Sequence, residues 1–165
     1  MEEEVLFEIE ARTNPGTKLI HNVSKHYIGK LVLTTKRIMF LSSGKSGASG
    51  VWGTALFLGP IVAALTDESR VKRIATEVDL SALSNEGSWE YELSERYASC
   101  GVGGSIWTVP FLRITGTDSD GQKQDHVVFR RALKKKVFAD LALRLEDASR
   151  LARCPSRKPH LDVNE

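Results

Sequence analysis

The fold of this chain is decided by one stretch, GKLVLTTKRIMFLS, at residues 29–42. Two runs of β-forming residues flank a short polar break at Thr35 and Lys36, a pattern typical of a β-hairpin. Alternate residues of a strand point to the same face, so one face of this hairpin should be buried. We expect that face to consist of Leu31, Leu33, Ile38 and Phe40.

Further strands are expected on both sides of the hairpin. Apolar residues at positions 5, 7 and 9 alternate with glutamates at 8 and 10, and apolar residues at 89, 91 and 93 alternate with polar residues at 90, 92 and 94. This alternation indicates half-buried strands at 5–12 and 89–98. An Asp-Gly turn at 118–121 favours a last hairpin, and the glycines of 101–105 predict a loop. The expected strands outside the central hairpin lie at residues 5–12, 18–23, 71–80, 89–98, 106–117 and 125–129.

The sequence period changes near the C-terminus. Here the apolar residues step by three and four, as on one face of a helix: Phe138, Leu141, Leu145, Ala148 and Ala152. The predicted helix covers about 131–153, and Arg150 and Arg153 in its last turn suit its macrodipole. Many short strands followed by one amphipathic helix, without βαβ alternation, indicate a mainly β fold. We expect a β-barrel or a β-sandwich whose open end is plugged by the C-terminal helix.

Length and composition indicate one intracellular domain. The 165 residues suit a single domain at 1–153, with an apolar insert at 44–68 and a polar tail at 154–165. The net charge of +2 is below the excess that a nucleic-acid-binding protein usually carries, but only the distribution of charge is informative. The basic residues of 130–136 are not interleaved with aromatic residues, so no nucleic-acid partner is expected. Cys100 and Cys154 form no CxxC pair, and the acidic start is not a secretion signal. These features predict a cytoplasmic location, including the inner face of a membrane.

The hairpin carries a resemblance to a known family. Residues 29–41 resemble the signature hairpin of GRAM and related bacterial and archaeal pleckstrin-homology-like (PH-like) domains, roughly Gly-Lys-Leu-x-Leu-Thr-x-x-Arg-hydrophobic-x-Phe. Residues 78–83 are similar to the family's strand that leads into a short turn, and the C-terminal helix agrees in order. The resemblance implies a PH-like β-barrel of two packed antiparallel sheets capped by the C-terminal helix. It also implies a binding role, since the family binds lipids, peptides and partner subunits.

A basic cluster at the start of the predicted helix is the first candidate site. Five cations fall within seven residues: Arg130, Arg131, Lys134, Lys135 and Lys136. The N-terminus of a helix already carries partial positive charge, so cations are unfavourable there. Together with the unpaired N–H groups of the helix, the cluster should attract a phosphate or an anionic membrane. Lys36 and Arg37 could add to this lipid-binding or anion-binding surface. The alternative is a solvated helix face balanced by Asp125 or nearby glutamates.

The apolar insert is the second candidate. Its apolar part at 51–65, VWGTALFLGPIVAAL, contains two glycines and a proline and is too short to span a bilayer comfortably. An apolar segment of this length is rarely left exposed to water. We therefore expect it to be buried against the barrel, to contact a partner subunit, or to insert shallowly into a membrane. The residues expected to make this membrane or partner contact are Trp52, Leu56, Phe57, Leu58, Ile61, Val62 and Leu65.

Patterns typical of enzymes are weak. Gly44-Lys45-Ser46 lacks the earlier glycine of a phosphate loop, and the four histidines show no metal-site spacing. Glu90 and Glu92 alternate on an expected exposed strand face, where solvation is their simplest role. We therefore expect a non-enzymatic binding module without cofactor or metal. Its expected partner is an anionic phospholipid or membrane surface, or alternatively a protein partner or a second copy of the chain.

Overall fold

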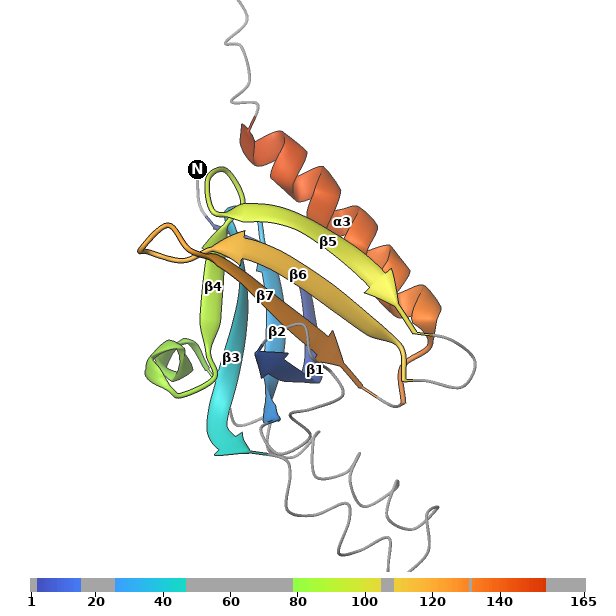
Figure 1. The fold of residues 1–165 in the computed structure, drawn as a ribbon. Coiled ribbons are helices and arrows are strands. Elements are labelled where there is room, and N and C mark those ends of the chain that lie inside the picture. Colours follow the sequence, from blue (N-terminus) through green and yellow to red (C-terminus); the bar gives the residue numbers. More distant parts are fainter. Residues whose placement is uncertain (1–2, 16–25, 47–78, 105–108, 131, 154–165) are drawn as a thin grey trace, which may run out of the picture.

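The computed structural model describes residues 3–15, 26–46, 79–104, 109–130 and 132–153. In this part, seven strands form one antiparallel sheet in the order β4-β3-β2-β1-β7-β6-β5, and a C-terminal helix packs against it (Figure 1). The strands are β1 (Val5–Pro15), β2 (Tyr27–Thr34), β3 (Arg37–Ser46), β4 (Trp89–Glu92), β5 (Tyr97–Gly103), β6 (Phe111–Thr117) and β7 (Lys123–Phe129). The helices are the 3-10 helix η2 (Leu80–Ser84) and the α-helix α3 (Lys135–Arg153). The mainly β prediction with a C-terminal helix is confirmed.

The seven strands belong to one hydrogen-bonded sheet, where the sequence predicted two packed sheets. β1 pairs with β2 along most of its length, and its last four residues, Arg12 to Pro15, also pair with β7. Strand β1 has 11 residues, which is long enough to pair with both neighbouring strands. It therefore joins the meander β1–β4 to the meander β5–β7.

The predicted central hairpin is confirmed. β2 and β3 pair so that Leu31 lies opposite Phe40 and Leu33 opposite Ile38, and all four side chains are completely buried. The turn is held by the Thr34 hydroxyl, which accepts hydrogen bonds from the backbone N–H groups of Lys36 (3.2 Å) and Arg37 (3.0 Å). A short polar side chain that bonds its own turn explains why the chain reverses at this point.

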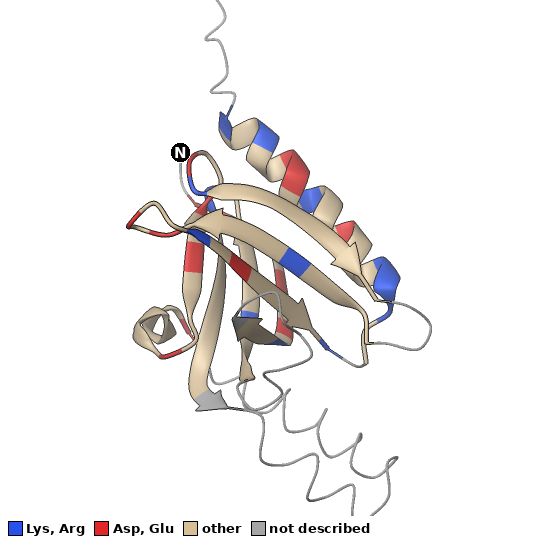
Figure 2. Ribbon diagram, viewed as in Figure 1, with Lys and Arg blue, Asp and Glu red and all other residues tan. Residues whose placement is uncertain are grey.

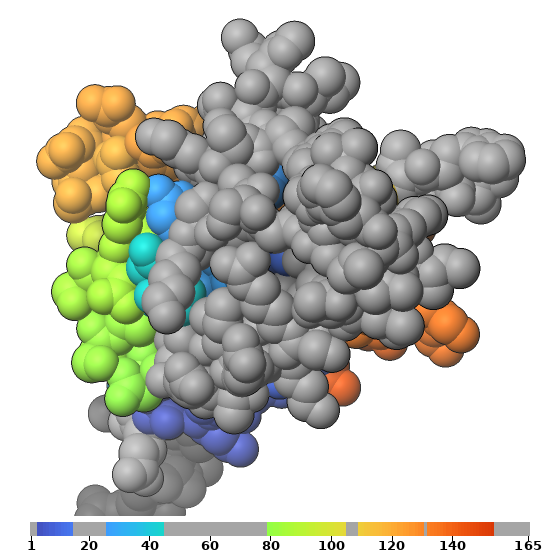
Figure 3. Space-filling model, turned by 90° about the horizontal axis from the view of Figure 1, so that it is seen from below, coloured from blue at the N-terminus to red at the C-terminus, as the bar shows by residue number. Residues whose placement is uncertain are grey.

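The main core lies between one face of the sheet and α3. The helix contributes its predicted apolar stripe, of which Phe138, Leu141 and Leu145 are fully buried. Burying a side chain of this size contributes roughly 1.5–3 kcal/mol. A smaller cluster on the other face joins β2 and β3 to Ala82 of η2. In the view of Figure 3, η2 and β4 (green) lie beside the end of β3 (cyan).

Two predictions between β4 and β6 were wrong. Residues 89–98 form two strands instead of one, because the chain turns after Glu92, whose carbonyl accepts a 2.9 Å hydrogen bond from Arg96 N–H. Part of the predicted loop at 101–105 belongs to β5, which continues to Gly103. Gly103 lies directly opposite Phe111, and any Cβ there would overlap the Phe111 ring. This glycine therefore makes room for an aromatic side chain across the sheet.

Other boundaries differ by a few residues. Strand β3 runs to Ser46, past the predicted start of the insert at residue 44, and Leu80 begins η2 instead of ending a strand. The helix begins at Lys135, later than predicted. The predicted strand at 18–23, most of the strand at 71–80, the insert from 47 onward and the tail at 154–165 lie outside the described residues. Among the helices that the structure describes, none has the length and apolar character to cross a membrane.

Candidate anion-binding surface

The predicted basic cluster spans the turn from β7 into α3. After Phe129 the chain makes two short turns, in which the carbonyl of Arg130 accepts from Leu133 N–H (3.2 Å) and that of Lys134 from Val137 N–H (3.0 Å). Lys134 is thus the residue immediately before the helix, and Lys135 and Lys136 open its first turn. The cluster therefore combines a loop with a helix N-terminus.

Three consecutive lysines form the exposed part of this cluster, and we call Lys134, Lys135 and Lys136 the lysine surface. All three are exposed. Lys135 donates a 3.0 Å hydrogen bond to the carbonyl of Gly104 at the end of β5. In the described part of the chain none of the three belongs to an ion pair, and the first turn of α3 contains no acidic residue. Figure 2 shows this end of α3 in blue.

The electrostatic setting of the lysine surface is unusual for a helix N-terminus. The first turn of a helix carries about half a positive charge from its unpaired N–H groups, so most helices place an acid or a capping hydroxyl there. Here the residue before the helix and the first two residues within it are all lysines. Positive side chains and backbone donors together can bind an anion such as a phosphate.

Arg130 is a structural residue in this arrangement. Its side chain is 14% exposed and forms a 2.9 Å ion pair with the carboxylate of Glu10 on β1. The same guanidinium donates to the Glu10 carbonyl at 3.3 Å. Arg130 therefore holds the start of the helix segment against the sheet. Arg131 lies outside the described residues.

The structure does not bring Lys36 and Arg37 to the lysine surface. The Lys36 carbonyl accepts from Leu93 N–H (2.9 Å), and the Leu93 carbonyl accepts from Arg153, the last residue of α3. The two basic sites are thus at opposite ends of a helix of 19 residues, a length of about 28 Å. Figure 1 shows the β2–β3 turn and the start of α3 far apart.

Arg37 is also engaged in ion pairs. Its guanidinium lies 2.9 Å from the carboxylate of Glu3 and 2.8 Å from that of Glu90. Partial burial raises the pKa of Glu3, but hydrogen bonds from Thr34 and Arg37 outweigh burial and leave the pKa below its usual value. Arg37 therefore ties the N-terminus and β4 to the central hairpin, a role that the basic sequence pattern did not reveal.

The apolar insert is the second candidate site that the sequence predicted. All seven residues expected to contact a membrane or partner lie outside the described residues: Trp52, Leu56, Phe57, Leu58, Ile61, Val62 and Leu65. Their role remains a prediction from the sequence.

A second polar feature, centred on His126, packs beside the core. The His126 ring stacks on Trp89 with 4.4 Å between centroids, and its Nε2 lies 2.8 Å from the Tyr91 hydroxyl. Burial lowers the pKa of His126 to about 4, and burial with nearby Asp118 and Asp125 raises the pKa of Tyr91 to about 12. Both side chains are therefore neutral near pH 7. The described residues contain no group of three metal-binding side chains.

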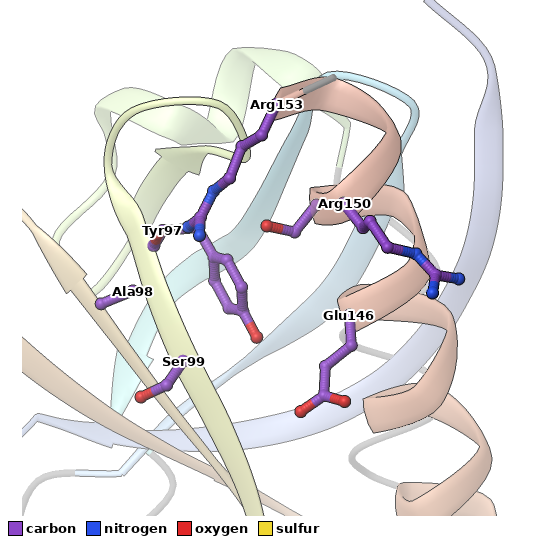
Figure 4. Close-up of a pocket in the computed structure, with 7 residues that line it drawn as sticks. Tyr97, Ala98, Ser99, Glu146, Arg150 and Arg153 are labelled. Carbon is purple, nitrogen blue, oxygen red and sulfur yellow. Dashed lines mark hydrogen bonds between the residues drawn. The ribbon is translucent and has the colours of Figure 1, made fainter.

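The structure shows one hollow that the sequence did not predict. It has a volume of about 380 Å³ and lies between β5 and the end of α3 (Figure 4). Its lining consists of Tyr97, Ala98, Ser99, Glu146, Ser149, Arg150 and Arg153. The Arg153 guanidinium lies 5.9 Å from the centre of the Tyr97 ring, and burial raises the pKa of Tyr97. Only the run of small residues after Tyr97 hinted at open space here.

Comparisons of the chain with family models, with curated proteins and with solved structures gave no match.

Proposed function

We propose that this protein is a non-enzymatic, PH-like binding module that associates with anionic phospholipid through the lysine surface. The observation that carries the proposal is the exposure of Lys134, Lys135 and Lys136 at a helix N-terminus without an acidic partner in the first turn. Other basic side chains, such as Arg37, Arg113 and Arg130, are paired with carboxylates on neighbouring strands. The lysine surface departs from this pattern at a position where cations reduce helix stability.

The strength of such a surface is modest. Each lysine or arginine near an anionic leaflet contributes about 1 kcal/mol, so three lysines contribute about 3 kcal/mol. A single signal of this size gives reversible binding, and stable anchoring usually takes a second contact. The predicted insertion of the apolar insert would supply that contact.

The element order supports the PH-like part of the proposal. A meander of four strands, a meander of three strands and a C-terminal helix follow one another along the chain. The resemblance of residues 29–41 to the GRAM hairpin falls on β2 and β3, which pair with each other within the first meander. We propose that the sheet curls into a PH-like barrel with α3 across its open end.

Vesicle flotation tests the proposal. The full chain is mixed with vesicles of phosphatidylcholine alone or with phosphatidylserine added, at low and physiological salt. We expect only the anionic vesicles to carry the protein, less so at higher salt. The variant Lys134→Glu/Lys136→Glu should lose this binding, while the matched control Lys123→Glu/Arg144→Glu, with the same net charge, should retain it. All four positions are exposed and outside the ion pairs of the described residues.

Two outcomes would refute the lipid function. One is equal flotation with neutral and anionic vesicles, and the other is equal loss of binding in both double variants, because either result would remove the lysine surface as the specific contact. A third outcome, in which no vesicle carries the protein, would refute the lipid function as well, and the apolar insert should then be sought in a protein interface.

A further inference from the structure

The two edges of the sheet are protected very differently. Edge strand β4 is four residues long, and it carries Glu90 and Glu92 on its exposed face. Edge strand β5 is seven residues long and contains no charged residue and no proline. Natural proteins usually shorten, charge or cover an exposed edge, because it otherwise pairs with another strand. In the described part of the chain, β5 pairs with β6 alone, so its other edge has no strand partner there.

Helix α3 runs antiparallel to β5 and has a fixed position along it. At one end Lys135 bonds the carbonyl of Gly104, and at the other Arg153 bonds that of Tyr97. In the middle, the Cys100 thiol lies 3.8 Å from the carbonyl of Ala142. The centre of the strand therefore lies beside the middle of the helix.

One side of α3 lies beside the edge of β5 that has no strand partner in the described part of the chain. Glu146 comes from this side, since it lines the hollow between the helix and Ser99 (Figure 4). Steps of four, three and four residues bring Lys135, Ala139 and Ala142 to the same side of the helix as Glu146. Along the helix this side reads cation, alanine, alanine, anion.

The pattern is self-complementary. Ala139 and Ala142 are symmetric about a point midway between them, and Lys135 and Glu146 are symmetric about that same point. A twofold axis there would place opposite charges together at both ends and small side chains at the centre. The contact between Cys100 and Ala142 puts the same axis near Gly101 on β5, where a Cβ would meet no atom within 4 Å.

We propose that two copies of the chain pair through their β5 edges, antiparallel about a twofold axis near Gly101, with the two α3 helices side by side. Lys135 of each copy then faces Glu146 of the partner subunit, and Ala139 packs against Ala142 of the partner subunit. Lys135 keeps its bond to Gly104, because an ammonium group has three donors. Such a symmetric contact closes at two copies.

This inference is independent of the proposed membrane role, and it is argued from β5 and α3 alone. Only Lys135 of the lysine surface lies at the proposed contact, while Lys134 and Lys136 stay accessible. Pairing would double the number of accessible lysines and strengthen binding to a membrane through avidity.

Sedimentation velocity of the full chain over a range of concentrations tests the dimer. We expect the wild type to dimerise, and Lys135→Glu or Glu146→Lys to raise the dissociation constant by about tenfold or more, because each change places like charges together twice. The double variant Lys135→Glu/Glu146→Lys should return to within about threefold of the wild type, because the opposite charges are restored. Gly101→Lys should abolish dimerisation, because the lysines introduced in the two copies would lie next to each other at the axis and repel.

The control Lys123→Glu should dimerise as the wild type does. Three results would overturn the proposal: a wild type that is monomeric throughout, a dimer that survives all the variants, or single variants whose defect the double variant does not rescue. Circular dichroism melts of each variant confirm that the fold is retained, which is expected because all the changed positions are exposed.

Discussion

The substitution Lys134→Asp separates stability from binding at the lysine surface. Lys134 occupies the position before α3, where an aspartate can accept hydrogen bonds from the N–H groups of the first turn. A lysine cannot accept such bonds, and its charge is repelled by the helix dipole. We therefore expect the variant to fold more stably and to bind anionic membranes more weakly.

The magnitudes follow from the position. A capping aspartate contributes about 1 kcal/mol over a residue that cannot cap, and reversing the charge beside the dipole adds about 0.5 kcal/mol. For a chain of this size, the resulting gain of about 1.5 kcal/mol raises Tm by about 3–6 °C. The change of two charge units near an anionic surface weakens vesicle binding by about 2 kcal/mol, or about 30-fold.

Urea unfolding followed by circular dichroism measures the first effect, and titration with phosphatidylserine vesicles the second. Lys134→Ala is the control, because it removes the charge without providing a cap, and it should weaken binding about fivefold with little gain in stability. A fall in stability on Lys134→Asp would show that the lysine has a structural role. Higher stability with unchanged vesicle binding would show that the lysine surface is not a membrane site.

Three further predictions concern the fold. Since burial lowers the pKa of His126 from 6.5 to about 4, the unfolded chain takes up a proton first, and up to about 3 kcal/mol of stability should be lost as the pH falls from 6.5 towards 4. Urea unfolding at several pH values should show a flatter profile for His126→Phe, and an identical profile would contradict the argument. Arg130→Gln breaks the contacts with Glu10 and should lower the free energy of unfolding by about 1–3 kcal/mol, whereas no change would show that the pair is not structural. Leu141→Ala empties a fully buried site in α3 and should cost about 2–5 kcal/mol in the same assay; a loss below 1 kcal/mol would mean that α3 does not pack on the sheet as described.

Local sequence patterns predicted the elements that depend on short-range periodicity. The central hairpin, its buried face and the apolar stripe of α3 follow from spacings of two and of three to four residues. The break between β4 and β5 was missed because the alternation runs through Leu93 and no glycine or proline marks the turn. The glycines of β5 suggested a loop. At Gly103, however, a glycine is required because the Phe111 ring on the opposite strand leaves no room for a Cβ, and only the strand pairing reveals this contact.

The candidate site was predictable in position but not in detail. Charge counting identified the cations around α3, yet it could not tell which of them are neutralised. Glu10 reaches Arg130 because β1 pairs with β7, and Glu3 reaches Arg37 because β1 lies beside the central hairpin. Such pairs join residues far apart in the sequence, so only the sheet topology separates structural cations from exposed ones.

The central claim is that Lys134 and Lys136 hold the protein on anionic membranes. It is tested most directly by the molar partition coefficient onto phosphatidylserine-containing vesicles at physiological salt, measured for the wild type and for Lys134→Gln/Lys136→Gln. Removing two charges near the surface should lower the coefficient about 30-fold, while Lys123→Gln/Arg144→Gln should leave it nearly unchanged. Equal coefficients for the wild type and both variants would contradict the claim.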